Sequence, residues 1–277
     1  MTIVVTIRVN DGIVLAADSA TSFVDGTGNV AKIYNSANKI FNLVKVWPVG
    51  AMTYGAGSIG AASISTLSKD LRKRLTPGGA VNSLTLNRET YTIQEVAEKS
   101  KVFFEECYRA AYQSPIAGYF LGYRVAGYSA NGTLPEAWEI RIVGDQFLGP
   151  DRVYDPDEQF GPRWAGETEA IDRLVMGVCS KTAEALVQLG LDQAAATQAV
   201  LGLVNHLYAP LFLPAMPIQD AIDLAYFLVD ASVKFAHFSL RPATVGGPIE
   251  VATITKHEGF KWVTRKHYFS AEFNVEG

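Results

Sequence analysis

Cysteine and histidine are scarce in this sequence. Of its 277 residues, only Cys107 and Cys179 are cysteines and four are histidines. Two widely separated cysteines cannot form the disulfide framework of a small secreted domain, so we expect two buried thiols in a reducing compartment, the cytoplasm. No group of His, Cys, Asp and Glu has the spacing of a metal site, and we expect no metal ion.

Long runs of one residue class are also absent. No apolar stretch reaches the ~18 residues that cross a membrane, and no basic segment or cleavage site of a secretion signal opens the chain. The net charge is −4, and the densest basic segment, KDLRKRL at 69–75, has its leucines at helical spacing. That pattern is typical of a solvated helix. We therefore expect neither a membrane nor a nucleic acid as partner.

What the chain does contain is 48% hydrophobic residues in regular patterns. Period-two alternation and helical spacing predict strands, two helices, strands, two or three helices, and strands. This order predicts one α+β domain over 1–277, with two sheets face to face and helices outside. The expected strands lie at 3–9, 13–19, 39–57, 119–144 and 247–265, the helices at 58–75, 92–113, 166–190, 192–208 and 217–238, and polar loops at 22–38 and 76–90.

The first two strands bring Thr2 close to an aspartate. An NDG turn closes the hairpin, and a three-residue loop with Gly12 in the left-handed conformation pairs Val4 with Asp18. In that register Thr2 and Asp18 are diagonal neighbours on one face. A two-residue loop would turn Asp18 onto the opposite, apolar face, where burying a carboxylate is unfavourable.

A glycine-rich segment suggests a different function. GAGSIG at 55–60 fits the G-x-G-x-x-G pattern of dinucleotide-binding loops and lies between an expected strand and an expected helix. Such a site also needs an acidic residue that ends a second parallel strand about twenty positions on. Residues 76–83, TPGGAVNS, provide neither the acid nor the strand. A nucleotide-binding protein is therefore the weaker alternative.

Thr2 lies directly behind the initiator methionine, which we expect to be removed before so small a residue. Thr2 would then carry a hydroxyl and an α-amine, and the amine, with a reference pKa of ~7.7–8.0, can accept the hydroxyl proton near neutral pH. A nearby lysine would lower that pKa by charge repulsion, and an aspartate beside it would hold the lysine in place. Asp18 and Lys39, which opens the next strand, are the candidates. Singly, each is better explained as a structural residue.

The combination resembles a known family. TIVVTIRVNDGIVLAADSAT at 2–21 is similar to the start of mature proteasome β-subunits, which are N-terminal-nucleophile hydrolases. NKIFNL at 38–43 resembles the strand that carries their catalytic lysine. GAMTYGAG at 50–57 resembles the segment whose glycine N–H forms the oxyanion hole. The resemblance is moderate over 117–145 and 217–265, and it implies a four-layer αββα sandwich.

The resemblance implies a role for individual residues. Thr2 would be the nucleophile and, through its amine, the base, while Lys39 would tune that amine and Asp18 would hold Lys39. The N–H of Gly55, or of Gly57, would stabilise the oxyanion. The residues expected to contact substrate are Thr21, Met52 and Gly57.

The chain also departs from the family pattern. Ala20 stands where the family has an arginine after its DS pair, and Lys32 begins a KI pair like that of the expected lysine. Glu167 replaces a serine, and Pro242 and Val245 replace the aspartate and serine that support the nucleophile's amine. Either Glu167 takes over this support by accepting from the ammonium, or the activity is slow, altered or lost.

The predicted function is a threonine-type amide hydrolase without a metal or organic cofactor. Its leading reaction is cleavage of a peptide or unfolded-protein substrate through an acyl-enzyme. The alternatives are hydrolysis or acyl transfer on a non-peptide amide, and a catalytically silent ring or scaffold subunit. Family members work in closed rings, so we expect a homo-oligomer, with an ATP-dependent unfoldase as a candidate partner. A helical insertion at 190–215 is expected to cap the site or to change assembly.

Overall fold

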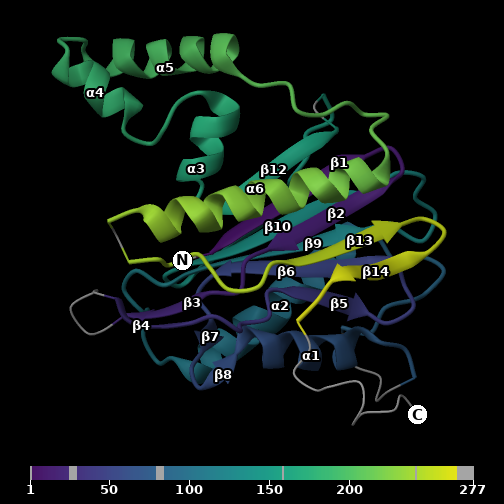
Figure 1. Cartoon of the computed structure of the whole chain (residues 1–277). Helices are drawn as coiled ribbons and strands as arrows, with labels where there is room; N and C mark the ends of the chain where they lie inside the picture. Colours follow the sequence, from purple (N-terminus) through teal and green to yellow (C-terminus); the bar gives the residue numbers. More distant parts are fainter. Residues whose placement is uncertain (1, 25–29, 79–83, 158, 241, 267–277) are drawn as a thin grey trace.

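The computed structural model describes residues 2–24, 30–78, 84–157, 159–240 and 242–266. Two five-stranded antiparallel sheets form its centre (Figure 1), which confirms the α+β class. In the first sheet the order is β12 (Gly161–Gly166), β1 (Ile3–Val9), β2 (Gly12–Ala17), β13 (Glu250–Thr255) and β14 (Gly259–Thr264). In the second it is β11 (Gln146–Arg152), β10 (Glu136–Val143), β9 (Phe120–Gly127), β6 (Val49–Gly55) and β5 (Ile40–Val44).

Helices and two short hairpins complete the described structure. The hairpins pair β3 (Thr21–Val24) with β4 (Val30–Tyr34), and β7 (Ser58–Ile59) with β8 (Ala62–Ser63). The helices are α1 (Ile64–Leu75), α2 (Ile93–Ala111), α3 (Glu169–Ile171), which continues into a π-helical turn at Asp172–Met176, α4 (Thr182–Gln188), α5 (Gln193–Leu207) and α6 (Ile218–Phe238).

The two sheets face each other across an apolar layer, and helices lie on their outer faces (Figure 1). Successive side chains of a strand point to opposite faces. Val4 of β1 and Leu15 of β2 therefore pack against Ile40 of the second sheet. Ile3 and Val5 point the other way and pack beneath α6. α1 and α2 cover the second sheet. The start of β1 is thus enclosed from both sides.

The hairpin of β1 and β2 is one residue tighter than expected. Val9 pairs with Gly12 and Val4 with Ala17 across a two-residue turn, so the predicted pairing of Val4 with Asp18 is wrong. Asp18 lies just past the end of β2 and is fully buried. This two-residue turn is unexpected from the sequence because it buries a carboxylate. The cost is offset by partners that are distant in sequence.

Gly12 is needed at this turn for a reason other than the predicted one. It does not adopt the left-handed conformation. A Cβ at this position would lie 2.8 Å from the carbonyl oxygen of Ile254. Glycine is therefore required because β13 approaches closely, which no local turn rule reveals.

Other boundaries also differ from the sequence prediction. The expected helix at 166–190 is broken, because Gly177 takes a left-handed φ of 71° between the π-helical turn and α4. The expected loop at 22–38 carries the β3–β4 hairpin, and the expected helix at 58–75 begins with β7 and β8. Helix α2 does begin as predicted, since the Thr92 side chain accepts from the Glu95 N–H. Met1 and residues 25–29 and 79–83 lie outside the described residues.

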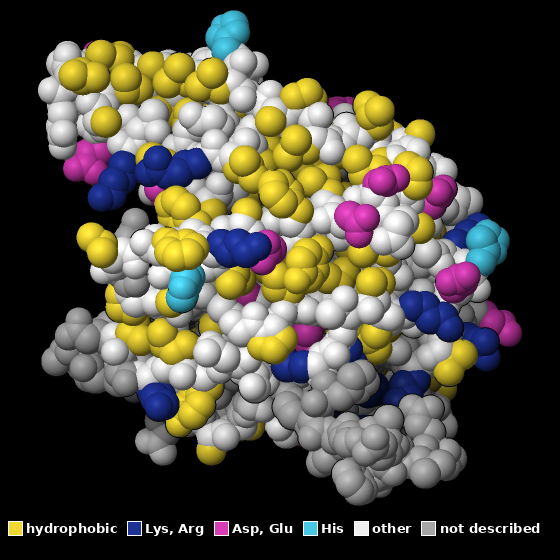
Figure 2. All heavy atoms as spheres, in the orientation of Figure 1, with side chains coloured by type: hydrophobic (Ala, Val, Ile, Leu, Met, Phe, Trp, Pro, Cys, Tyr) yellow, Lys and Arg dark blue, Asp and Glu magenta, His cyan; other side chains and the backbone are white. Residues whose placement is uncertain are grey.

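Helices α4 and α5 form an arm that extends away from the sheets (Figure 1). Of the residues described in this arm, none is buried in α4 and only Ala196 is buried in α5. Leu201 and Leu207 are exposed by 55% and 50%. Figure 2 shows hydrophobic side chains gathered over α5. The body of this chain therefore leaves the arm's apolar side chains uncovered.

The two cysteines and the longer helices bear on what the composition predicts. Cys107 and Cys179 are free but only half-buried, so the expectation of two buried thiols is wrong. Burial raises the pKa of the Cys107 thiol. None of the helices described is both long enough and apolar enough to cross a membrane.

Candidate active site

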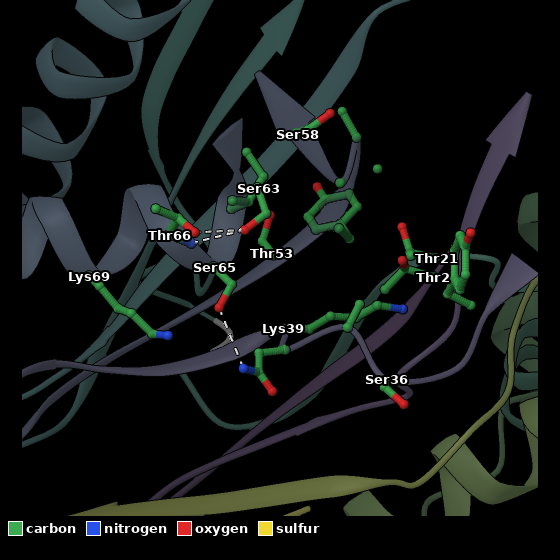
Figure 3. Close-up of a pocket in the computed structure, with 18 of the residues that line it drawn as sticks. Thr2, Thr21, Ser36, Lys39, Thr53, Ser58, Ser63, Ser65, Thr66 and Lys69 are labelled. Atoms are coloured by element: carbon green, nitrogen blue, oxygen red, sulfur yellow. Dashed lines mark hydrogen bonds between the residues drawn. The ribbon is translucent and has the colours of Figure 1, made fainter. Parts of the chain in front are cut away.

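A pocket of about 760 Å³ lies beside Thr2 at the start of β1 (Figure 3). Its walls come from the ends of β6 and β7, the segment before β5 and the start of α1, so distant parts of the sequence meet there. In Figure 3, Lys39 extends toward Thr2 and Thr21. Lys32, the alternative lysine, lies exposed on β4 outside the lining. Five of the eight predicted site residues line the pocket: Thr2, Thr21, Lys39, Gly55 and Gly57.

Asp18 and Lys39 form a buried ion pair beside this pocket. Lys39 Nζ donates to Asp18 Oδ1 at 2.6 Å, and the two side chains are 5% and 0% exposed. The Asp18 carboxylate also accepts from the backbone N–H groups of Ile3 at 3.1 Å, Ala20 at 3.1 Å and Gly246 at 3.0 Å. Charge-assisted hydrogen bonds from four donors offset the loss of water around this carboxylate. They explain how the tight hairpin can bury Asp18.

Burial also changes the chemistry of the lysine. Removal from water lowers the pKa of Lys39 below its ordinary value, and the attraction of Asp18 opposes this shift. Lys266 lies close enough to lower the pKa of Lys39 further by charge repulsion. A cation held here would in the same way lower the pKa of an amine on Thr2.

The last residues of β12 fix the position of Thr2. The Glu167 N–H donates to the carbonyl oxygen of Thr2 at 2.8 Å, and Gly166 pairs with Ile3. A Cβ on Gly166 would lie 1.8 Å from that oxygen, and its φ of 101° is left-handed. Only glycine fits this position. Thr2 is 3% exposed, so both its surroundings and its backbone direction are set by neighbouring strands.

The backbone at Gly55 and Gly57 borders the same pocket. Gly55 has a φ of 87°, and a Cβ there would lie 2.5 Å from the carbonyl oxygen of Phe120. A Cβ on Gly57 would lie 2.7 Å from Thr21 Oγ1. Both glycines therefore allow a close approach of the chain, and the oxyanion role of their N–H groups stays a prediction. The choice between them stays a prediction.

The structure does not bring Met52 or the Glu167 side chain to this pocket. Met52 is buried between the sheets, where its sulfur accepts from the Thr6 hydroxyl at 3.3 Å. Glu167 lines a separate cavity of about 40 Å³ together with Pro242. Its described hydrogen bond to Thr2 is made by the backbone. Support for a Thr2 amine from Glu167 therefore stays a prediction.

A second buried ion pair, which sequence reasoning missed, lies next to the first. Lys266 Nζ is 3.2 Å from Glu250 Oε2 and donates to Ser19 Oγ at 2.7 Å and to the Ala37 carbonyl at 2.6 Å. Ser19 and Ala37 are close sequence neighbours of the two residues in the first pair. Lys266 therefore ties together the two segments that carry Asp18 and Lys39.

No local pattern marks this second pair, because Lys266 joins the site from the far end of the described chain. The one usable signal was the serine of the DS pair, since a buried hydroxyl needs hydrogen-bond partners. The Ser19 hydroxyl donates to the Pro248 carbonyl at 2.6 Å. A buried serine hydroxyl therefore predicts that a hydrogen-bond partner exists, but the sequence does not identify Lys266 as that partner.

The structure argues against the dinucleotide alternative. The strand before the GAGSIG segment, β6, is antiparallel to both of its neighbours, and the β7–β8 hairpin separates the first glycines from α1. A dinucleotide site needs a parallel strand that leads straight into a helix N-terminus. Across the described ranges, no three His, Cys, Asp or Glu residues gather as a metal site.

Two facing antiparallel sheets with helices outside are an arrangement that solved structures already contain. The chain is similar to Anbu (ancestral beta-subunit) from Yersinia bercovieri, with 14% identity and a TM-score of 0.54 over 96% of this chain and 89% of that chain. It is also similar to Anbu from Pseudomonas aeruginosa, described as a helical assembly, with 17% identity and a TM-score of 0.51 over 96% and 88%. A third similar structure is Anbu from Hyphomicrobium sp. strain MC1, with 13% identity and a TM-score of 0.54 over 95% of this chain and 86% of that chain. No protein-family profile and no curated protein matches the chain.

These comparisons correct the family assignment made from the sequence. The sequence pattern resembles proteasome β-subunits, whereas the solved structures reported above with a similar fold are Anbu proteins. The assignment to the β-subunit family is therefore wrong. At 13% to 17% identity the Anbu structures show the fold alone. The chemistry must be argued from the residues of this chain.

Proposed function

We propose that this protein is a threonine-type amide hydrolase whose nucleophile is Thr2, once Thr2 is the first residue of the working chain. The observation that carries the proposal is the convergence of Thr2, the buried Asp18–Lys39 pair and the Gly55–Gly57 backbone on one pocket. Peptide-bond cleavage is the leading reaction. Hydrolysis or acyl transfer on a non-peptide amide uses the same groups.

The reaction would proceed in two balanced halves. The Thr2 hydroxyl oxygen attacks the amide carbonyl while its proton passes to the α-amine of the same residue. The C–N bond breaks, the leaving amine takes that proton, and the acyl group stays on Thr2 as an ester. Water then attacks the ester, the amine accepts its proton, and the acid leaves as the hydroxyl is restored.

The surrounding residues have separate tasks in this scheme. The Lys39 ammonium keeps the α-amine of Thr2 neutral near pH 7 by charge repulsion, and Asp18 holds Lys39 in place. A backbone N–H at Gly55 or Gly57 stabilises the negative oxygen of the tetrahedral intermediate, a contribution of about 3 kcal/mol in other enzymes. The groups that need positioning are thus held by buried contacts.

Catalytic silence is the competing proposal, and one observation favours it. The side chains of Pro242 and Val245 carry no polar group that could support the amine, and Val245 is buried in the apolar core beneath α6. A subunit that keeps the fold and loses the activity would look like this. The helical assembly named for Anbu from Pseudomonas aeruginosa supports a homo-oligomeric state in either case.

Several finer expectations belong to this proposal. Helices on the outer faces of two facing sheets support a four-layer αββα sandwich. A single domain over 1–277 with a helical insertion at about 190–215, a cytoplasmic location, a closed ring and an ATP-dependent unfoldase partner stay predictions. None of them alters the chemistry proposed at Thr2.

Intact mass spectrometry after incubation with a peptide epoxyketone tests the proposal. This electrophile forms a ring with both the hydroxyl and the amine of a terminal threonine. We expect one adduct on the wild type, one on Thr2→Ser, and none on Thr2→Ala. The same spectrum reports whether Thr2 is the first residue. A purified, assembled protein that retains residues before Thr2 and takes up no probe would exclude the hydrolase and favour the silent subunit.

A further inference from the structure

A second cavity adjoins the Thr2 pocket on the side of α1. It has a volume of about 280 Å³ and shares Asn38, Ser65 and Lys69 with the first pocket. In Figure 3, Lys69 extends from α1 toward Ser65, and Lys39 lies farther along the same pocket. The two cavities meet at these shared residues, where the Asn38 amide donates to Ser65 Oγ at 3.4 Å (Figure 3), and we refer to the adjoining pair as the depression.

Positive charge dominates the lining of the second cavity. Glu250 is the one acidic residue among the described residues that line it, and Lys266 already engages its carboxylate at 3.2 Å. No ion pair joins any of the cavity's own cations to another described side chain. These cations come from the turn after β5, from α1 and from the end of β14: Lys45, Lys69, Arg72 and Arg265.

Two of these cations, Arg72 and Arg265, repel each other. Burial lowers the pKa of Arg72, and Arg265 lowers it further by charge repulsion, against an opposing attraction from Tyr123. The buried Nε of Arg72 has no hydrogen-bond partner in the part of the chain described here. The whole chain has a net charge of −4, so the cluster does not reflect composition. A hollow lined by one sign of charge concentrates ions of the opposite sign.

We propose that the paired cavities bind the acyl part of the amide substrate and that this part carries a carboxylate, such as an acidic side chain in a peptide. The inference rests on the proposed Thr2 chemistry, which places the reacting carbonyl at one end of the depression. The carboxylate then lies at Lys69, with Arg72 and Lys45 behind it. A substrate without this charge leaves the cations unpaired when it displaces their water.

Serine and threonine side chains in the lining of the Thr2 pocket support this assignment. Hydroxyl groups suit a substrate side chain that accepts hydrogen bonds, because a hydroxyl that is not already donating within the protein can turn to donate. A large apolar side chain would instead remove water from these hydroxyls without replacing it. The serines and threonines that line the pocket beyond Thr2 are Thr21, Ser36, Thr53, Ser58, Ser63, Ser65 and Thr66, and its described lining contains no acidic residue.

Two matched peptide epoxyketones test the proposal on the full-length, assembled protein. They differ only at the residue bonded to the reactive group, which is Glu in one and Gln in the other. We expect the Glu probe to label Thr2 about tenfold faster, since hydrogen bonds between charged groups exceed neutral ones by this order. Lys69→Gln should reduce the ratio to about twofold, and Lys69→Glu should invert it, so that the Gln probe labels faster than the Glu probe.

Lys73→Gln is the matched control. Lys73 lies one turn farther along α1, is 80% exposed and pairs with Asp70 at 3.5 Å, outside both cavities. This variant removes the same charge from the same helix and should leave the ratio of the two labelling rates unchanged. Raising the salt concentration should lower the ratio in the wild type, because ions screen the attraction.

The outcomes separate this inference from the proposed function. Labelling of Thr2 at equal rates by both probes, or a ratio that survives Lys69→Gln, overturns the acidic specificity and leaves the hydrolase standing. Labelling by neither probe overturns the hydrolase. In that case calorimetric binding of the unreactive Glu and Gln peptide amides decides the charge preference, and equal affinity overturns it.

Discussion

Charged side chains are buried around Thr2, whereas apolar side chains are exposed along the α4–α5 arm. Asp18 and Lys39 are almost inaccessible, while Leu201 and Leu207 are about half exposed. Burying a charge is tolerated only when partners satisfy it, and an exposed apolar row lacks a partner within the described chain. The site is therefore restrained by contacts from several segments, whereas the described contacts of the arm are mainly those between α4 and α5 and those with the π-helical turn.

The largest expected effect comes from breaking the first ion pair. Asp18→Asn leaves the Lys39 ammonium buried without its anion and should lower the free energy of unfolding by about 3–5 kcal/mol. Urea unfolding measures this loss, and epoxyketone labelling should disappear. The double variant Asp18→Asn with Lys39→Met should recover a substantial part of the stability and none of the labelling. A loss below 1 kcal/mol in the single variant would contradict a buried, fully bonded pair.

Breaking the second ion pair should cost somewhat less. Lys266→Met leaves the buried Glu250 carboxylate without a cation, and we expect a loss of about 3 kcal/mol. Adding Glu250→Gln should restore about half of it. Lys261→Met, an exposed lysine on β14, is the control and should change stability by less than about 0.5 kcal/mol. Equal losses of stability in the Lys266 and Lys261 variants would show that the Lys266–Glu250 ion pair does not stabilise the fold.

The pH dependence of labelling tests the charge repulsion between Lys39 of the first ion pair and Lys266 of the second. Burial lowers the pKa of Lys39, so labelling should decline with rising pH before the ordinary lysine pKa of 10.5 is reached. Lys266 is a neighbouring cation, and its removal favours the charged form of Lys39. In Lys266→Met the pKa of Lys39 should therefore rise, and the decline should move to higher pH. A shift to lower pH would contradict the electrostatic contact.

The smallest expected effect lies in the arm. Leu201→Ser should change the unfolding free energy of the monomer by less than about 0.5 kcal/mol, because the side chain loses little buried area. Leu15→Ala, in a strand of the fully buried hairpin, should cost about 2–5 kcal/mol. Both are measured by urea unfolding under conditions where the protein is monomeric. A cost above 1 kcal/mol for Leu201→Ser would mean that this leucine is covered.

Sequence reasoning was most successful where the decisive pattern is local. Alternation in residues 3–9 predicted β1, and the capping box predicted the start of α2, because each depends on neighbours within a few residues. It failed at the first turn, where a general penalty for burying Asp18 outweighed partners that cannot be seen locally. It also failed at 166–190, where the left-handed Gly177 breaks a continuous helical pattern.

The sequence by itself determined the α+β class and the strand that begins beside Thr2, since these follow from periodicity, while the candidate pairing of Asp18 with Lys39 came from the combined pattern that resembles the β-subunits. Only the tertiary structure decided the register of the first hairpin, the second ion pair at Lys266 and the cluster of cations near Lys69. The physical reason is that a buried charge is stabilised by whichever donors lie nearby in space. Gly246 and Lys266 reach the first hairpin only after the chain has folded.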